Sequence, residues 1–302
     1  MEIIESIINI SEGRDNETVK YIADSVKNTS GCFLLDSSSD PDHNRSVISF
    51  VGNRKSLPIA VQEFFKRALE KIDLRKHHGE HPRIGAVDVV PFVPIREVTM
   101  QEVVAFSKEI GEMLAKTFNL PIFLYEESQK IAERKNLALI RKGEFENLPE
   151  KMKDPVWRPD FGPSLPHPSA GATVVGARMP LIAFNVNLGT KDVNIANAIA
   201  KAIRGSSGGL AAVKALGIVL QNREIVQVSM NLVDYKKSPI FRVFEMIRSE
   251  AKRYGVPIVG SEIIGLIPQE ALCEAAEFYL KIENFAPSLI LENKINDVIR
   301  FS

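Results

Sequence analysis

The sequence predicts an α/β (α+β) protein made of two ferredoxin-like subdomains, each with the element order βαββαβ. The main observation is that strand-like and helix-like apolar patterns alternate in this order up to Val93 and again after Arg178. The chain has 302 residues, of which 45% are hydrophobic, so it can form two cores. We therefore expect subdomains at residues 1–178 and 179–302, with a ligand crevice or tunnel between them.

Each element of the first half has a local signal. Apolar residues such as Ile22 and Val26 recur at helical spacing, and Gly31 follows as a stop signal. Pro58 falls in the first turn of the next helix, where a missing N–H costs little, and Thr99 opens a capping box. A turn-rich stretch is expected at 37–45. These signals predict strands at 3–10, 33–35, 47–51, 84–93 and 122–125, and helices at 16–27, 56–69 and 99–118.

The second half repeats the pattern. Strands are expected at 181–186, 213–220, 225–232 and 256–264, and helices at 192–204, 239–254 and from about residue 268. The repeat lies in the order of the elements, because the residues of the two halves do not match convincingly. Between the halves, residues 149–171 are rich in Pro, Gly, Ser and His, which predicts a loop with a function.

Composition and charge exclude several classes of protein. Lys+Arg and Asp+Glu balance at 38 each, so no overall field favours nucleic acid or an acidic membrane. Cys32 and Cys273 are far apart, which argues against a disulfide framework and indicates a reducing compartment. The first residues lack the pattern of a secretory signal, and no uncharged apolar run is long enough to span a bilayer. We expect a cytoplasmic protein that binds neither nucleic acid nor membrane.

The stretch from Lys76 to Phe92, KHHGEHPRIGAVDVVPF, contains three of the five histidines and leads into an apolar strand. Its glycines and prolines predict a loop at a strand end, where catalytic groups are commonly placed. An imidazole with a pKa of about 6.5 takes and gives protons near neutrality, so His81 is the candidate acid/base. Glu80 or Asp88 is expected to orient its second ring nitrogen.

The segment from His77 to His81 also matches the H-x-x-E-H signature of zinc peptidases. That site needs both histidines on one continuous helix, which Gly79 and Pro82 oppose, and no clear third ligand follows. We therefore expect no metal. For His77 and His78 we favour a solvated loop without a chemical role.

Other polar residues lie at predicted strand ends or on one face of a strand. Asn9 is near the end of the first strand, while Asn44 and Arg45 come just before the third. An arginine there is suited to bidentate binding of a carboxylate. Asn187 and Asn231 place amides on strands of the second half. Taken alone, each pattern is more typical of a turn or of an exposed strand surface.

Together these stretches resemble the formiminotransferase family, which contains glutamate formimidoyltransferase and the N-terminal half of the bifunctional formiminotransferase-cyclodeaminase. The resemblance covers about residues 3–284. It rests on the segments NISEGRD, DPDHNRSVISFVG, HHGEHPRIGAVDVVPFVPI, WRPDFGPSLPHPSAGATVVGAR, LIAFNVNLGT, QVSMNLVDY and IVGSEIIGLIP. The GEHPR and DFGPS stretches, in order and at family spacing, are the most specific part.

The resemblance implies that a formimidoyl group moves from N-formimidoyl-L-glutamate to N5 of tetrahydrofolate, a step of histidine degradation and one-carbon metabolism. Tetrahydrofolate is then a co-substrate, and a homodimer is expected. The catalytic histidine of the family falls on His81. The folate-binding segment falls on Gly162, Pro163, Ser164, Leu165, Pro166, His167, Pro168, Ser169, Ala170 and Gly171.

Both implied substrates carry carboxylates, so guanidinium groups are expected beside the site. The candidates are Arg45, Arg83 and Arg178, each next to a family segment. Further substrate contacts are expected from Asn9, Asn44, Glu80, Asp88, Asn187 and Asn231.

Two alternatives keep the fold and change the function. A related folate enzyme would use 5-formyl-tetrahydrofolate or N-formylglutamate, and a comparison of the donors in one assay distinguishes it. A non-catalytic folate-binding protein is the second alternative. The histidine at a strand end disfavours it, because binding alone requires no base there.

Overall fold

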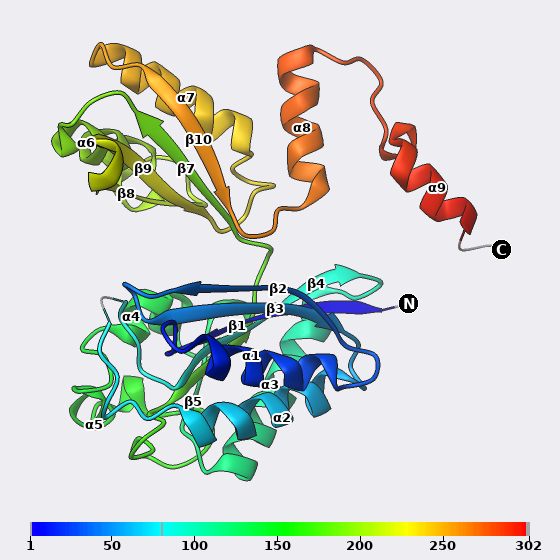
Figure 1. Ribbon diagram of the computed structural model, residues 1–302, viewed down its shortest axis with the longest axis vertical. Helices are drawn as coiled ribbons and strands as arrows, with labels where there is room; N and C mark the ends of the chain where they lie inside the picture. The colour runs from blue at the N-terminus through cyan, green and yellow to red at the C-terminus, as the bar shows by residue number, and fades with distance from the viewer. Residues whose placement is uncertain (1, 80, 300–302) are drawn as a thin grey trace. The chain divides into compact units, whose positions relative to one another are not determined.

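The structure is a computed structural model that describes residues 2–79 and 81–299 (Figure 1). The chain divides into two compact units, Met1–Arg178 and Met179–Ser302. Each unit has its own β-sheet and its own hydrophobic core, and each is described by itself. The expected crevice between the subdomains stays a prediction.

Unit 1 begins with the predicted βαββαβ order. Its first elements are β1 (Ile3–Ile10), α1 (Asn16–Lys27), β2 (Phe33–Asp40), β3 (Arg45–Gly52), α2 (Leu57–Lys71) and β4 (Val87–Arg96). The sheet places these strands in the order β2-β3-β1-β4, and every neighbouring pair is antiparallel. This is the ferredoxin-like arrangement, so the fold class predicted from the sequence is confirmed for this unit.

The sheet of unit 1 continues beyond β4. The added elements are α3 (Met100–Phe118), β5 (Ile122–Leu124), α4 (Leu137–Arg141), α5 (Leu148–Lys151) and β6 (Thr173–Ala177). Strand β6 lies between β4 and β5 and is parallel to both, which gives the order β2-β3-β1-β4-β6-β5. β6 was not predicted, because a strand buried along its whole length shows no alternation of polar and apolar residues.

Helices α1, α2 and α3 cover one face of this sheet (Figure 1). The main core lies between them and includes Phe64 and Phe92, both fully buried. A smaller core forms around Val89, Phe123 and Ile140, which brings α4 against β4 and β5. Val89 belongs to this smaller core and Val90 to the main core. Successive side chains of a strand point to opposite faces, so the two cores lie on opposite faces of the sheet. The centre of the sheet is therefore covered on both sides.

Unit 2 repeats the βαββαβ order. Its elements are β7 (Ile182–Leu188), α6 (Val193–Ile203), β8 (Val213–Leu220), β9 (Ile225–Leu232), α7 (Ile240–Arg253), β10 (Ile258–Ile264), α8 (Gln269–Leu280) and α9 (Leu291–Ile299). The strand order is β10-β7-β9-β8 with antiparallel neighbours, the same arrangement as in the first four strands of unit 1. The predicted duplication is thus present in the topology.

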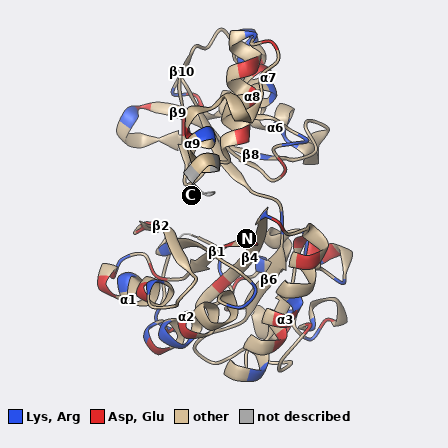
Figure 2. Cartoon of the chain, turned by 90° about the vertical axis from the view of Figure 1, so that its right-hand side faces the viewer, with Lys and Arg blue, Asp and Glu red and all other residues tan. Residues whose placement is uncertain are grey.

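The surface of the protein carries mixed charges. In Figure 2, Lys and Arg alternate with Asp and Glu along α1, α2 and α3, in agreement with the equal numbers of the two signs in the sequence. Among the described residues, none of the helices combines the length and the apolar character that crossing a bilayer requires.

Two predictions about local structure were wrong. Strand β2 runs to Asp40, so Ser37, Ser38 and Ser39 belong to a strand and not to the turn. Their pairing with β3 outweighs the turn preference of serine.

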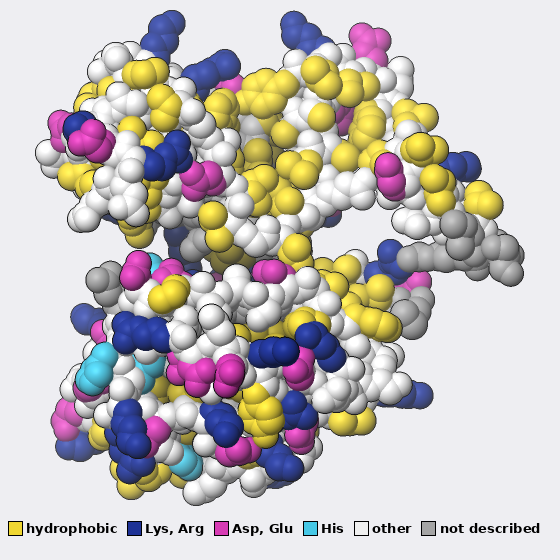
Figure 3. Space-filling model, in the orientation of Figure 1, with side chains coloured by type: hydrophobic (Ala, Val, Ile, Leu, Met, Phe, Trp, Pro, Cys, Tyr) yellow, Lys and Arg dark blue, Asp and Glu magenta, His cyan; other side chains and the backbone are white. Residues whose placement is uncertain are grey.

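Helix α9 was not predicted either. It carries exposed apolar side chains, as does α8 (Figure 3): Leu272, Phe278, Tyr279, Leu280, Leu291, Ile295 and Val298.

Candidate active site

The histidine loop, residues 72–86, connects α2 to β4. Backbone hydrogen bonds hold it near both ends. Leu74 N donates to Ser169 O over 2.8 Å, and Ala86 N donates to Ala170 O over 2.9 Å. The loop therefore lies directly beside the segment 162–171, although the two are far apart in the sequence.

The segment 162–171 ends in a tight turn. Backbone bonds of 2.8 and 2.9 Å join His167 and Gly171, and Nδ1 of His167 accepts from the N–H groups of Ser169 and Ala170. Gly171 has φ +69°, and a Cβ there would lie 2.0 Å from Ile84 O in the histidine loop. Glycine thus permits the close approach of the two segments. The contact of this segment with folate stays a prediction.

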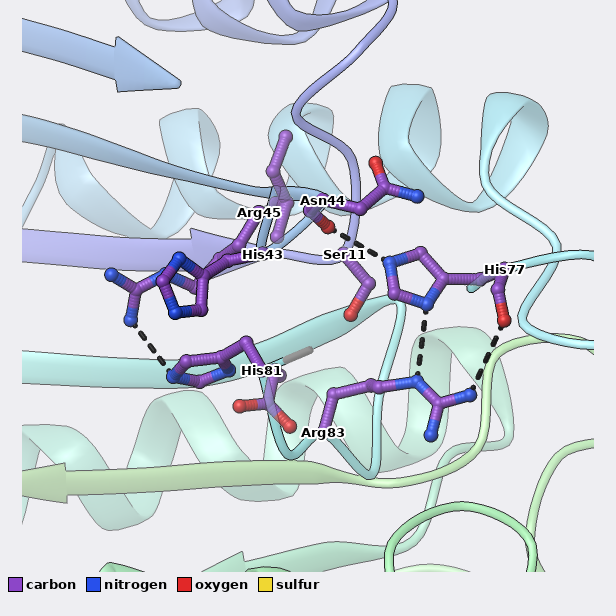
Figure 4. Close-up of a pocket in the computed structure, with 9 residues that line it drawn as sticks. Ser11, His43, Asn44, Arg45, His77, His81 and Arg83 are labelled. Carbon is purple, nitrogen blue, oxygen red and sulfur yellow. Dashed lines mark hydrogen bonds between the residues drawn. The ribbon is translucent and has the colours of Figure 1, made fainter. Parts of the chain in front are cut away.

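A small pocket lies where the histidine loop meets the end of β1 and the start of β3 (Figure 4). It brings together several predicted site residues that the sequence separates. The described residues that line it include none from the segment 162–171; they are Ile10, Ser11, His43, Asn44, Arg45, His77, His81, Arg83 and Asp88.

His81 accepts a hydrogen bond from Arg45 in this pocket (Figure 4). Arg45 Nη1 lies 2.9 Å from His81 Nε2. Because a guanidinium only donates, Nε2 is the acceptor, and the neutral ring carries its proton on Nδ1. Burial, followed by the charges of Arg45, Arg141 and His43, lowers the pKa of His81 to about 3. The imidazole is therefore neutral at physiological pH when the pocket holds no substrate.

Arg45 is a partly buried cation, and its hydrogen-bond partners among the described residues are neutral. Its Nη1 also donates to Asn9 Oδ1 over 3.3 Å, and its Nε is buried without a hydrogen-bond partner. Burial and the nearby Arg141 lower the pKa of Arg45. Asn9 and Arg45, both predicted as substrate contacts, are thus in contact with each other and next to His81.

His77 differs from its prediction. It is buried at 7% exposure, with Nε2 donating to Asn44 O over 2.8 Å and Nδ1 accepting from Arg83 Nε over 3.1 Å. Burial lowers the pKa of His77, so it is neutral. The expectation of a solvated His77 was wrong, because both of its ring nitrogens are hydrogen-bonded to other residues of the protein. His78 is exposed, as expected.

Arg83 holds the histidine loop in place. Its two Nη atoms donate to Glu144 Oε2, to both carboxylate oxygens of Glu146 and to His77 O. With Nε on His77, all five N–H groups of Arg83 have partners. These contacts favour a structural role, and the predicted contact of Arg83 with substrate finds no support in them.

Asn44 and Asp88 are also engaged in holding the chain. Asn44 has φ +47°, and its side chain accepts from Gly13 N and donates to His78 O, each over 3.0 Å. Asp88 is 2% exposed and accepts from Ile84 N and from Arg141. The sequence suggested that Asp88 orients His81, and this stays a prediction.

Arg141 is a site residue that the sequence analysis missed. It projects from α4, donates to Asp88 through Nε over 2.8 Å, and is close enough to His81 to lower the pKa of the ring. No motif marks Arg141, which follows Asp88 by 53 positions. The only available signal was that a buried aspartate such as Asp88 needs a cation.

Three other predicted residues, all within the described part of the chain, are not among those that line the pocket. Asn187 is 2% exposed and bonded to Gln227 and Glu262, two residues the sequence analysis did not name. Asn231 is exposed on β9. Arg178 follows β6 and forms a hydrogen bond with the buried Tyr125. Glu80 lies outside the described residues.

The structure also bears on metal binding. Among residues 2–79 and 81–299, no group of three or more His, Cys, Asp or Glu side chains is placed to hold an ion. Both ring nitrogens of His77 are bonded to protein groups, as described above.

The fold and the pocket define an α/β protein with two βαββαβ units, of which the first gathers histidines and arginines at a strand end. Comparison with known proteins gives the family. A family model described as "Formiminotransferase domain, N-terminal subdomain" matches residues 3–178, and one described as "Formiminotransferase domain" matches residues 183–300. The chain belongs to the formiminotransferase family, as the resemblance predicted.

The similarity to individual proteins supports the same family assignment. The chain is 50% identical to glutamate formimidoyltransferase of Streptococcus pyogenes serotype M1 over 295 residues, covering 97% of this chain and 99% of that protein. It is 44% identical to glutamate formimidoyltransferase of Thermoplasma acidophilum, covering 98% of each. It is 43% identical to formimidoyltransferase-cyclodeaminase of Sus scrofa, covering 94% of this chain and 53% of that protein.

We expect Gly171→Ala to destabilise unit 1 by more than about 3 kcal/mol, because the strain of a positive φ, roughly 1–2 kcal/mol, adds to the clash with Ile84 O. Urea unfolding followed by fluorescence of Trp157, the only tryptophan, measures this. Gly255→Ala is the matched control: φ is +67°, yet nothing lies within 4 Å of its added Cβ. Equal losses in the two variants, with Gly255→Ala followed by circular dichroism, would contradict the close-approach argument.

The depressed pKa of His81 predicts a loss of stability in acid. The unfolded imidazole binds a proton below about pH 6.5 while the folded one stays neutral to about pH 3, so stability falls as pH falls through this window. His81→Asn keeps an acceptor for Arg45 and removes the titration. Between pH 6.5 and 5 we expect wild type to lose up to about 2 kcal/mol more than this variant, less where solvent screens the ring. Parallel pH profiles of unfolding free energy would refute the depressed pKa.

Proposed function

We infer that this chain is a glutamate formimidoyltransferase, a folate-dependent transferase of one-carbon groups. The observation that carries this is the 50% identity to a glutamate formimidoyltransferase over 99% of that protein's length. The reaction moves the formimidoyl group from N-formimidoyl-L-glutamate to N5 of tetrahydrofolate, and glutamate leaves. We place it in histidine degradation, where a formimidoyl donor of this kind arises.

The reaction needs two proton transfers. N5 of tetrahydrofolate attacks the formimidoyl carbon, and the new C–N bond leaves N5 positively charged in a tetrahedral intermediate. A base then removes the N5 proton. The glutamate nitrogen takes up a proton as its bond to the same carbon breaks, so the two transfers balance. A single group that first accepts and then donates is sufficient, and such a group contributes roughly 10² to 10⁴ in rate.

We propose His81 as that group. Its ring lines the pocket, its Nε2 carries a lone pair, and it belongs to the loop whose ends are hydrogen-bonded to the segment 162–171. We further propose that this segment binds the folate. Holding both substrates at one place contributes separately to the rate through proximity.

The proposed substrate contacts differ in their support. Arg45 and Asn9 lie next to His81 and have hydrogen-bonding capacity to spare. For Asn44, Arg83 and Asp88 we propose a positioning role, since their side chains are bonded within the chain. Contacts from Arg178, Asn187, Asn231 and Glu80 remain proposals that rest on the family resemblance.

We further propose that the protein is a homodimer and that it is cytoplasmic. The exposed apolar side chains of α8 and α9 support an association of chains (Figure 3). The two distant cysteines support a reducing compartment.

We expect His81→Ala to fold normally and to lose 10² to 10⁴ of kcat for formimidoyl transfer, because the proton carrier is gone. His78→Ala, an exposed histidine in the same loop, is the control and keeps near-native turnover. A spectroscopic assay of 5-formimidoyl-tetrahydrofolate formation measures both. Near-native turnover of His81→Ala would end the acid/base proposal.

The donor is tested separately, with N-formimidoyl-L-glutamate, N-formyl-L-glutamate and 5-formyl-tetrahydrofolate supplied at equal concentration. We expect kcat/KM for the formimidoyl donor to exceed the others by at least tenfold, because an amidine nitrogen is protonated more readily than a formyl oxygen. Higher kcat/KM for a formyl donor would reassign the activity to a related folate enzyme.

A further inference from the structure

Arg45 differs in its partners from three other buried or partly buried arginines of unit 1. Arg83, Arg134 and Arg141 each form an ion pair with one or more carboxylates, at Glu144 and Glu146, at Asp160 and at Asp88. Among the described residues, no carboxylate lies within ion-pair distance of Arg45. Burying a cation without a counter-charge is costly, so such an arginine is expected where an anion will bind.

The acceptors that Arg45 does have are neutral. Its Nη1 donates to His81 Nε2 and to Asn9 Oδ1, while Nε is buried with no acceptor. A carboxylate would bind this guanidinium more strongly than the two neutral acceptors do, because it adds the attraction of an opposite charge and can accept two parallel N–H bonds. A carboxylate that enters the pocket is therefore favoured over His81 as the partner of Arg45.

The other candidates for anion binding in the pocket are already neutralised. Arg83 has all five N–H groups bonded, and Arg141 is held by the buried Asp88. His43 bonds to Asp40 over 2.6 Å. Arg45 is thus the pocket cation, within the described part of the chain, whose charge an incoming carboxylate can meet.

We propose that Arg45 is the receptor for a carboxylate of the glutamate-derived donor, and that its occupation releases Nε2 of His81 for proton transfer. This rests on the proposed function and adds a coupling: the base is free only when the donor is bound. In the empty pocket Arg45 both blocks the lone pair of His81 and places a positive charge beside it. Binding of an anion removes both effects together.

Charged groups from several elements surround His81. Arg45 on β3, Arg141 on α4 and His43 in the β2–β3 turn lower its pKa. The acidic groups, Asp40 on β2 and Asp88 on β4, are bonded to His43 and Arg141. Burial is the largest cause of the low pKa of His81, and the charge of Arg45 comes next. Since Arg141 stays with Asp88, the charge that substrate can cancel is that of Arg45, and cancelling it raises the pKa of His81 above about 3.

The experiment follows the His81 ring by NMR of protein labelled with ¹⁵N-histidine, assigned with His81→Asn. N-acetyl-L-glutamate is the probe, because it carries the donor's two carboxylates and has no formimidoyl group. We expect saturation with this probe to raise the pKa of His81 by at least one unit and to shift the Nε2 signal. Its uncharged diamide is the control ligand and leaves the signal unchanged.

Two variants separate the charge of Arg45 from its shape. Arg45→Gln raises the pKa of His81 without ligand, abolishes the response to the probe and raises KM for the donor at least tenfold. Arg45→Lys keeps the charge but not the planar fork, so the pKa of His81 stays low while KM rises. Arg75→Gln, which removes an exposed arginine paired with Asp73, is the matched control and changes neither quantity. Circular dichroism checks that each variant is folded.

The inference and the proposed function can fail independently. An unchanged His81 signal in Arg45→Gln, or on saturation with N-acetyl-L-glutamate, overturns the coupling even if His81→Ala is inactive. Full activity of His81→Ala overturns the acid/base role even if the His81 signal responds to the probe.

Discussion

The need to satisfy buried polar groups shapes the active-site region. The described residues of the histidine loop form no strand or long helix, so side chains from other elements must bind their backbone and charges. Asn44 binds it from the β2–β3 turn, Asp88 from β4, and the glutamate partners of Arg83 from the segment after α4. These contacts hold the loop at the end of the sheet and leave the ring of His81 in the pocket.

The pocket leaves one charge unbalanced, and its chemistry follows from that. Arg45 has neutral acceptors only among the described residues, while the acids nearby are taken by His43 and Arg141. A site prepared in this way attracts anions and keeps a histidine neutral in their absence. A glutamate-derived donor and a folate both carry carboxylates, so the electrostatics of the pocket agree with the activity inferred from the family.

The two units share one strand topology but carry different polar residues. The sheet order of β1 to β4 is repeated by β7 to β10, but only unit 1 carries the histidine pocket described above. Unit 2 instead places the buried amides of Asn187 and Gln227 against the partly exposed carboxylate of Glu262. Duplication of a βαββαβ unit thus supplies two stable scaffolds, and the residues at the strand edges decide what each one does.

The sequence by itself determined the βαββαβ order of the two halves and the family, because periodic apolar residues and contiguous motifs are local signals. It also singled out His81, whose catalytic role stays a prediction. It missed β6, which is buried along its length, and misplaced Ser37 to Ser39, whose strand pairing depends on β3. Only the tertiary structure decided which arginines are free to act. Arg83 and Arg45 look alike in the sequence, yet Arg83 is paired with two glutamates, whereas Arg45 has only neutral acceptors among the described residues. Hydrogen bonds between residues distant in the chain make that difference, and no local pattern records them.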